Sequence, residues 1–239
     1  MEEWLPNVNR LYFTGGEPTI IQRVYWILEK CVELGINDNI DLVFNSNMTN
    51  IQPRFLDLIA KFKSVLMCLS VDGYGTTNEY IRSGSTWSIV DKHIRDYATS
   101  DVVGNLLFSP VVQIYNILNV TDLIDYAELI QKETGRRIDI SFLLNNYPKC
   151  LDIRNLPQNV RDAAVKHLET WSATSTYFAE DERNKQTVLG LIKALKENYN
   201  EDSEEQMKIF KEYTALLDSK RNQSMADSLP DLYKLLYET

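Results

Sequence analysis

Residues 11–18 read Leu-Tyr-Phe-Thr-Gly-Gly-Glu-Pro, and an amphipathic segment from Thr19 to Leu34 follows them. This is the order of a short apolar strand, a glycine turn and a helix. Gly15 and Gly16 have no Cβ, so the chain can take positive φ there and a ligand can approach the backbone. Pro18 suits the first turn of a helix, where its missing N–H costs little. We therefore predict a strand, a ligand-binding loop and a helix.

Glu17 indicates which kind of ligand this loop would bind. A carboxylate beside bare backbone carbonyls suits a cationic amine, whereas phosphate-binding glycine loops need N–H donors and usually a lysine. No lysine lies near this stretch. The loop therefore favours an amine-bearing ligand, and a plain structural turn is the alternative.

The composition excludes several classes of function. The 239 residues are enough for a full core, as one large domain or a domain with an appendage, and the net charge is −9. Such an acidic chain is a poor candidate for binding nucleic acid or an anionic membrane. The sequence contains no apolar run of membrane-spanning length and no signal-peptide pattern. We expect a cytoplasmic protein.

The cysteines and histidines are dispersed along the chain. Cys31 falls on the amphipathic segment and Cys68 inside an apolar run, so both are interpreted as core residues. Cys150 lies in a predicted loop, and His93 and His167 are solitary. We therefore expect neither a disulfide framework nor a dedicated metal site in this chain.

Apolar periodicity predicts strands that alternate with helices. The predicted strands are 11–13, 40–44, 65–71, 106–115 and 138–144, and the intervening helices are 19–34, 53–62, 87–98 and 121–135. This alternation indicates parallel β/α units. We expect the strand at 65–71, which is largely apolar, to be covered on both faces. From Pro157 to Tyr237 the pattern is helical, so we predict an α/β domain at 1–150 and a helical region at 151–239.

Gly15-Gly16-Glu17-Pro18 at a strand end resembles the second-strand motif of the radical S-adenosylmethionine (SAM) enzymes. In that family the backbone and the glutamate of this motif hold the methionine ammonium of SAM. The resemblance implies that residues 15–18 bind SAM.

Ser70-Val71-Asp72-Gly73, followed by a loop with Arg82 and Gly84, is a second match. It is similar to the Ser-(Ile/Leu/Val)-Asp-Gly motif of peptide-modifying members of the family. The resemblance implies that Ser70 and Arg82 contact the SAM carboxylate and that Asp72 lines the mouth of the active site. A guanidinium offers a two-pronged donor to a carboxylate. A solvated loop charge is the alternative for Arg82.

The remaining matches, which are weaker, are Asn47, Gln113, Asn116 and Leu143. Asn47 lies in a polar segment that resembles the family's Thr-Asn-Gly, with Met48 in place of the glycine, and a strand-to-helix turn explains it equally well. By resemblance, Gln113 and Asn116 would meet the SAM ribose and Leu143 the adenine. Asn116 has a turn residue as its alternative.

The chain departs from the family pattern in one respect. Members carry a C-x-x-x-C-x-x-C loop upstream of the glycine motif, and its thiolates hold a 4Fe–4S cluster. Met1 stands only thirteen residues before Thr14, and no later cysteines reproduce the spacing. We expect an N-terminally truncated chain, and a relative that lost its cluster is the alternative. Residues 1–5 resemble the interior of a helix, and truncation would leave the strand at 11–13 as an exposed sheet edge.

The fold expected from this resemblance is a partial parallel (β/α) barrel of the radical SAM type, with a helical tail similar to the twitch-domain subgroup. The implied function is SAM binding and, in a full-length form with a 4Fe–4S cluster, generation of a 5′-deoxyadenosyl radical. That radical would abstract hydrogen from an unknown substrate, with a peptide or protein as one candidate. The alternatives are a non-catalytic SAM- or nucleotide-binding module or scaffold, and an enzyme that uses Glu17 and Asp72 as acid and base. No catalytic residue is assigned.

Overall fold

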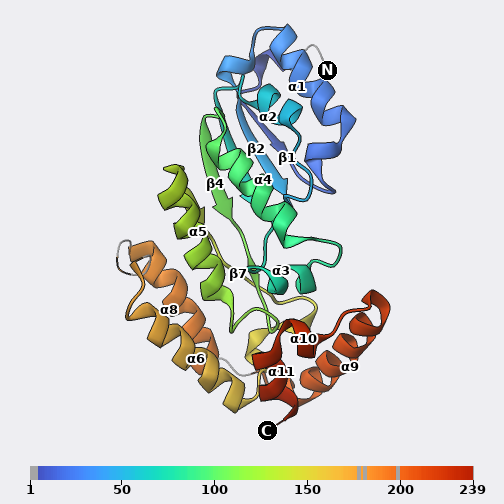
Figure 1. Ribbon diagram of the computed structural model, residues 1–239, viewed down its shortest axis with the longest axis vertical. Helices are drawn as coiled ribbons and strands as arrows, with labels where there is room; N and C mark the ends of the chain where they lie inside the picture. The colour runs from blue at the N-terminus through green and yellow to red at the C-terminus, as the bar shows by residue number, and fades with distance from the viewer. Residues whose placement is uncertain (1–4, 177–178, 180–181, 198–199, 239) are drawn as a thin grey trace. The chain divides into compact units, whose positions relative to one another are not determined.

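The computed structural model describes residues 5–176, 179, 182–197 and 200–238; Met1–Trp4, for which we expected a helix interior, lie outside them. The predicted α/β fold with five parallel strands is confirmed (Figure 1). The strands are β1 (Arg10–Phe13), β2 (Asp41–Ser46), β3 (Ser64–Leu69), β4 (Gly104–Phe108) and β6 (Ile138–Ile140), in the order β1-β2-β3-β4-β6. Among the described residues β1 pairs with β2 alone, so it forms one edge of this sheet.

One face of the sheet is more deeply buried than the other. In β3 the side chains of Val65, Met67 and Leu69 are buried, whereas the alternate residues Leu66 and Cys68 are half-buried. Successive residues of a strand point to opposite faces. We predicted that this strand is covered on both faces; one face is buried and the other is only partly covered, a difference that an apolar composition alone does not reveal.

Three helices pack on the buried face: α1 (Gln22–Glu33), α2 (Pro53–Ile59) and α4 (Trp87–Thr99) (Figure 1). The ring of Phe44 in β2 meets that of Phe55 in α2 edge-on, with 5.2 Å between centroids. Tyr25 in α1 joins them, 5.9 Å from Phe55. The Tyr97 hydroxyl in α4 donates to the Val65 carbonyl at 3.1 Å. Aromatic packing and this hydrogen bond hold the helices to the sheet.

The predicted strands 106–115 and 138–144 are each divided in two. β4 ends at Phe108 and is followed by β5 (Val111–Val112), and β6 is followed by β7 (Leu143–Leu144). β5 and β7 pair with each other in a separate two-stranded parallel sheet. Pro110 lies at the break in the first strand, because proline has no N–H to continue a ladder.

The chain packs as two compact units. The first comprises the residues up to Val71, Ser85–Ser109 and Ala127–Ile140, and the second comprises Asp72–Gly84, Pro110–Tyr126 and Ser141–Thr239. The predicted boundary near residue 150 falls inside the second unit. α5 (Val120–Thr134) contributes residues to both units.

The second unit is mainly helical, as predicted for the C-terminal region. Its helices are α3 (Thr76–Ile81), α6 (Gln158–Ser172), α8 (Glu182–Glu197), α9 (Ser203–Arg221), α10 (Met225–Ser228) and α11 (Pro230–Tyr237). We predicted a loop with Arg82 and Gly84 after Gly73, but the chain forms the short helix α3 before Arg82; Thr77, Asn78 and Tyr80 on this helix are buried. Among the described residues, no helix is long and apolar enough to cross a membrane.

Arg136 closes the end of α4 in the first unit. Its guanidinium donates to the carbonyls of Ala98 at 3.0 Å, Ser100 at 2.6 Å and Gly104 at 3.0 Å, and it also bonds to the carbonyl of Val102. The last carbonyls of a helix have no partner within the helix, so donors from elsewhere must satisfy them.

We predict that Arg136→Lys lowers the stability of the first unit by about 2 kcal/mol, because an ammonium cannot replace a planar donor that serves several carbonyls. Arg137→Lys is the matched control, since Arg137 makes an exposed ion pair with Asp139 and should change stability by less than about 0.5 kcal/mol. Urea unfolding followed by circular dichroism measures both. Equal midpoints for the two variants would contradict the capping role.

Candidate functional site

The loop after β1 has the conformation that its glycines predict. Gly15 has φ +84° and Gly16 has φ +61°, and both are exposed. A Cβ at Gly15 would meet nothing within 4 Å, so the backbone conformation and not lack of space calls for glycine there. Pro18 is buried and begins a short 3-10 helix, Pro18–Ile20, for which Glu17 is the N-cap.

The Glu17 carboxylate is buried and bound to donors of the protein itself. Its Oε2 accepts from the Asn47 N–H at 2.8 Å, and its Oε1 accepts from the Thr19 N–H at 3.3 Å and lies 2.8 Å from the Thr19 hydroxyl. The carboxylate thus joins the loops that follow β1 and β2. The exposed backbone of Gly15 and Gly16 is the part of this loop that a ligand can reach.

Asn47 and Ser70 follow the neighbouring strands β2 and β3. The Ser70 N–H donates to the Ser46 carbonyl at 2.8 Å, next to Asn47. The structure therefore brings Gly15–Pro18, Asn47 and Ser70 together at the carboxyl end of the sheet in the first unit. Thr19, which is fully buried and also lies 2.6 Å from the Asn50 carbonyl, is a support that our sequence analysis missed. A threonine two residues after an acidic N-cap residue is common, so the sequence only weakly indicates that Thr19 binds the Glu17 carboxylate.

Asp72 begins the second unit and is only 5% exposed. Its Oδ1 accepts from the Val111 N–H at 2.8 Å, and its Oδ2 lies 2.8 Å from Nε of Arg82. A buried carboxylate needs such partners, because an unpaired charge in the interior is costly. Asp72 is therefore enclosed by protein rather than open to a ligand.

The guanidinium of Arg82 is fixed on one side. Its contact with Asp72 is an ion pair in which the buried Nε–H is not aligned with the carboxylate oxygen. Within the described part of the chain, the two terminal nitrogens of Arg82 have no hydrogen-bond partner, and the side chain is 30% exposed. The edge of the guanidinium that carries the two terminal nitrogens therefore remains available to a ligand.

Asn116 and Gln113 lie beside Asp72 and differ in what their side chains do. The fully buried Asn116 donates through Nδ2 to the Asp72 carbonyl at 2.7 Å and the Val111 carbonyl at 3.0 Å, and its Oδ1 accepts from the Gln113 N–H at 2.8 Å. Gln113 is 7% exposed as a residue, and its carboxamide, which has no partner among the described residues, is not among the fully buried unpaired groups. Asn116 therefore supports the turn, and the Gln113 carboxamide is open to solvent.

Leu143 completes the group in the second unit. It pairs with Val111 in the β5–β7 sheet, its N–H donates to the Pro110 carbonyl at 3.0 Å, and its side chain is 55% exposed. Since the Val111 N–H also holds Asp72, the structure connects Asp72, Arg82, Gln113, Asn116 and Leu143 through one network.

The cysteines do not fit a 4Fe–4S cluster. Cys31 and Cys150 are buried and Cys68 is half-buried, and burial raises the pKa of all three thiols above the ordinary value. Iron is held by thiolates, which a raised pKa disfavours. Within the described ranges, no group of three or more Cys, His, Asp or Glu side chains is placed to hold a metal ion.

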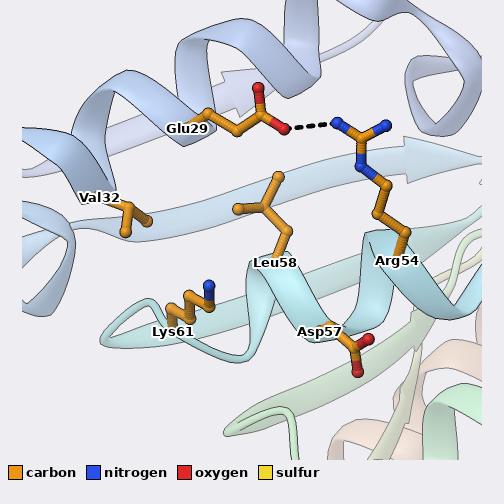
Figure 2. Close-up of a pocket in the computed structure, with 6 residues that line it drawn as sticks. All are labelled: Glu29, Val32, Arg54, Asp57, Leu58 and Lys61. Atoms are coloured by element: carbon orange, nitrogen blue, oxygen red, sulfur yellow. Dashed lines mark hydrogen bonds and ion pairs between the residues drawn. The ribbon is translucent and has the colours of Figure 1, made fainter.

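A surface pocket of about 240 Å³ lies between α1 and α2, away from the predicted site residues. Figure 2 shows Glu29 of α1 and Arg54 of α2 meeting across it, 2.6 Å apart. Val32 and Leu58 supply its apolar lining, and Asp57 and Lys61 are charged. None of the residues predicted to bind SAM lines this pocket.

We predict that Glu17→Gln lowers stability by about 1–3 kcal/mol, because the amide must turn a donor toward either Asn47 or Thr19. Hydrogen exchange of the Asn47 amide should become faster than in the unsubstituted chain. Glu29→Gln is the control, since Glu29 makes an exposed ion pair and should have little effect. Unchanged exchange at Asn47 would contradict the bracing role of Glu17.

We also predict that the purified chain retains essentially no iron or acid-labile sulfide after anaerobic reconstitution. Its thiols should react with Ellman's reagent slowly in the native state and quickly in urea, because burial both hides them and keeps them protonated. Stoichiometric iron and sulfide would contradict the assignment of the three cysteines to the core.

No protein-family model matches the chain, and no curated protein matches it. Among solved structures, it is similar to Streptococcus suis SuiB bound to S-adenosylmethionine, with 15% identity over 72% of this chain and a TM-score of 0.46. It is also similar to anSMEcpe with bound AdoMet and the Cp18Cys peptide, with 16% identity over 72% of this chain and a TM-score of 0.45. A third structure, Streptococcus suis SuiB bound to the precursor peptide SuiA, has 14% identity over 69% of this chain and a TM-score of 0.44.

The matches cover 39%, 52% and 35% of those three chains, respectively, so this chain spans about half of their length or less. Likenesses with these identities and TM-scores do not assign a family.

Proposed function

We propose that this chain is a SAM-binding protein of the radical SAM type, with a partial β/α barrel and a helical tail of the twitch kind. In this proposal Arg82, in the second unit, binds the methionine carboxylate of SAM. Gln113 is the candidate contact for the ribose and Leu143 for the adenine.

The observation that carries the proposal is the state of Arg82. Its guanidinium is fixed by a buried carboxylate and keeps a terminal edge for a second one. Among the residues that the structure describes, the two terminal nitrogens of Arg82 have no hydrogen-bond partner, although the side chain is only 30% exposed. A ligand carboxylate would give these nitrogens two charge-assisted hydrogen bonds, because a guanidinium can bind a carboxylate in two places.

The first unit, taken by itself, offers a separate candidate contact for an ammonium group, the exposed backbone of Gly15 and Gly16. Because Glu17 is tied to Asn47 and Thr19, the loop holds its shape without a ligand. A preformed loop spends less of its binding energy on ordering. The carboxylate also keeps a negative charge next to the exposed glycines.

Radical chemistry would need a 4Fe–4S cluster, which supplies the electron that cleaves SAM. The three cysteines of this chain do not fit one, so cluster ligands would have to come from outside the given sequence. We therefore propose SAM binding for this chain and assign it no step of the radical reaction. A peptide substrate is part of the proposal only through the resemblance of Ser70–Gly73 to peptide-modifying members.

A non-catalytic SAM-binding module is the second candidate, and the burial of the cysteines favours it. Acid–base catalysis by Glu17 and Asp72 is less favoured, because donors of the protein already occupy both carboxylates. The radical SAM-type protein and the non-catalytic module both predict that the chain binds SAM.

We predict that the chain binds SAM in isothermal titration calorimetry and that Arg82→Lys weakens binding by about tenfold or more, since charge-assisted hydrogen bonds contribute about 1.5–3 kcal/mol. Arg154→Lys is the matched control. Arg154 also pairs with a buried aspartate, Asp152, in the second unit, and its side chain is similarly exposed. It should leave SAM affinity unchanged.

Absence of saturable SAM binding at millimolar ligand would overturn the proposal. Equal losses in the Arg82 and Arg154 variants would also count against it, because they would reflect general destabilisation of the second unit.

A further inference from the structure

We infer that Asp72 is a positioning residue, which turns the guanidinium of Arg82 so that its terminal edge meets the carboxylate of the ligand. This assignment rests on the proposed function and differs from the expectation that Asp72 itself lines the active-site mouth. It follows from how completely Asp72 is held by its own unit.

Both oxygens of the Asp72 side chain have fixed partners. The Val111 N–H donates to Oδ1, and Oδ2 is the oxygen that forms the ion pair with Arg82. Val111 is itself part of the β5–β7 sheet. The direction of the carboxylate is therefore set by strand pairing and not by the ligand.

The backbone of Asp72 is held as firmly as its side chain. Its N–H donates to Oδ1 of Asn78 at 3.1 Å, and its carbonyl accepts from Nδ2 of Asn116 at 2.7 Å. Both asparagines are fully buried. Hydrogen bonds from two segments thus prevent Asp72 from turning toward solvent.

This arrangement determines which side of Arg82 faces outward. A guanidinium has five N–H donors in a plane, one on Nε and four on the terminal nitrogens. Because Nε lies against Asp72 and the two terminal nitrogens have no partner among the described residues, we assign the edge between those two nitrogens to the ligand carboxylate, which it can bind in two places. Lysine in place of Arg82 would have a single ammonium for both tasks.

The test is Asp72→Asn, compared by calorimetry with two ligands that differ in one group. SAM carries the methionine carboxylate, and decarboxylated SAM lacks it but keeps the ammonium. In the variant, the single carboxamide oxygen must serve the Val111 N–H, so the NH₂ group faces Arg82 and no longer holds it. We expect the preference of the chain for SAM over decarboxylated SAM to fall about tenfold, with little change for decarboxylated SAM.

Asp152→Asn is the matched control. Asp152 is a buried aspartate of the same unit that pairs with Arg154. Its loss should cost similar stability but leave the preference between the two ligands unchanged. If the Asp72 variant does not fold, a crystal structure of the wild-type chain with SAM decides the question, because Arg82 should then contact both Asp72 and the ligand carboxylate.

Three results would overturn the inference. An unchanged preference in Asp72→Asn would mean that Arg82 is oriented by something else, and equal losses for both ligands would mean that Asp72 only stabilises the loop. A guanidinium that leaves Asp72 in the SAM complex would have the same meaning. A wild-type chain that binds neither ligand, or binds both equally, would instead refute the proposed function and the inference with it.

Discussion

Two segments of the second unit are held together by the need to satisfy a buried charge, that of Asp72. Asp72 is the first residue of that unit, and a carboxylate in the interior must find donors or else destabilise the fold by several kcal/mol. The Val111 N–H donates to this carboxylate and Arg82 forms an ion pair with it, and the backbone of Asp72 is held by Asn78 and Asn116. The segments 72–84 and 110–116 are therefore ordered together. Arg82, the residue to which we assign ligand binding, acquires its orientation from this requirement.

The first unit also contains a buried carboxylate, and neutral donors satisfy it. The buried carboxylate of Glu17 is surrounded by the N–H groups of Thr19 and Asn47 and by the Thr19 hydroxyl. N–H groups aimed at a carboxylate stabilise it without a second charge. As a result the glycine loop is joined to the next strand, and the exposed backbone of residues 15 and 16 is held in place. In both units a carboxylate interpreted as a ligand contact is also part of the framework.

Because these carboxylates belong to the framework, the sequence predicts the conformation of the glycine loop but not which polar side chains face a ligand. A glycine pair, a proline and an acidic residue after an apolar run are local signals, and the loop has the backbone that they predict. Whether Asp72 or Asn116 faces a ligand is not a local property. An asparagine at position 116 suits either a turn or a ribose contact, and only its hydrogen bonds to Asp72 and Val111 distinguish the two roles.

The sequence by itself determined the alternation of strands and helices, the glycine loop and the core location of Cys31, because periodicity and backbone preference act over a few residues. Tertiary structure decided which face of β3 is covered, that β5 pairs with β7 in a separate sheet, and which partner holds Arg82. Those features depend on partners in other segments of the chain, such as Val111 for Asp72. Burial and hydrogen bonding between distant segments carry no local pattern, so only the folded chain reveals them.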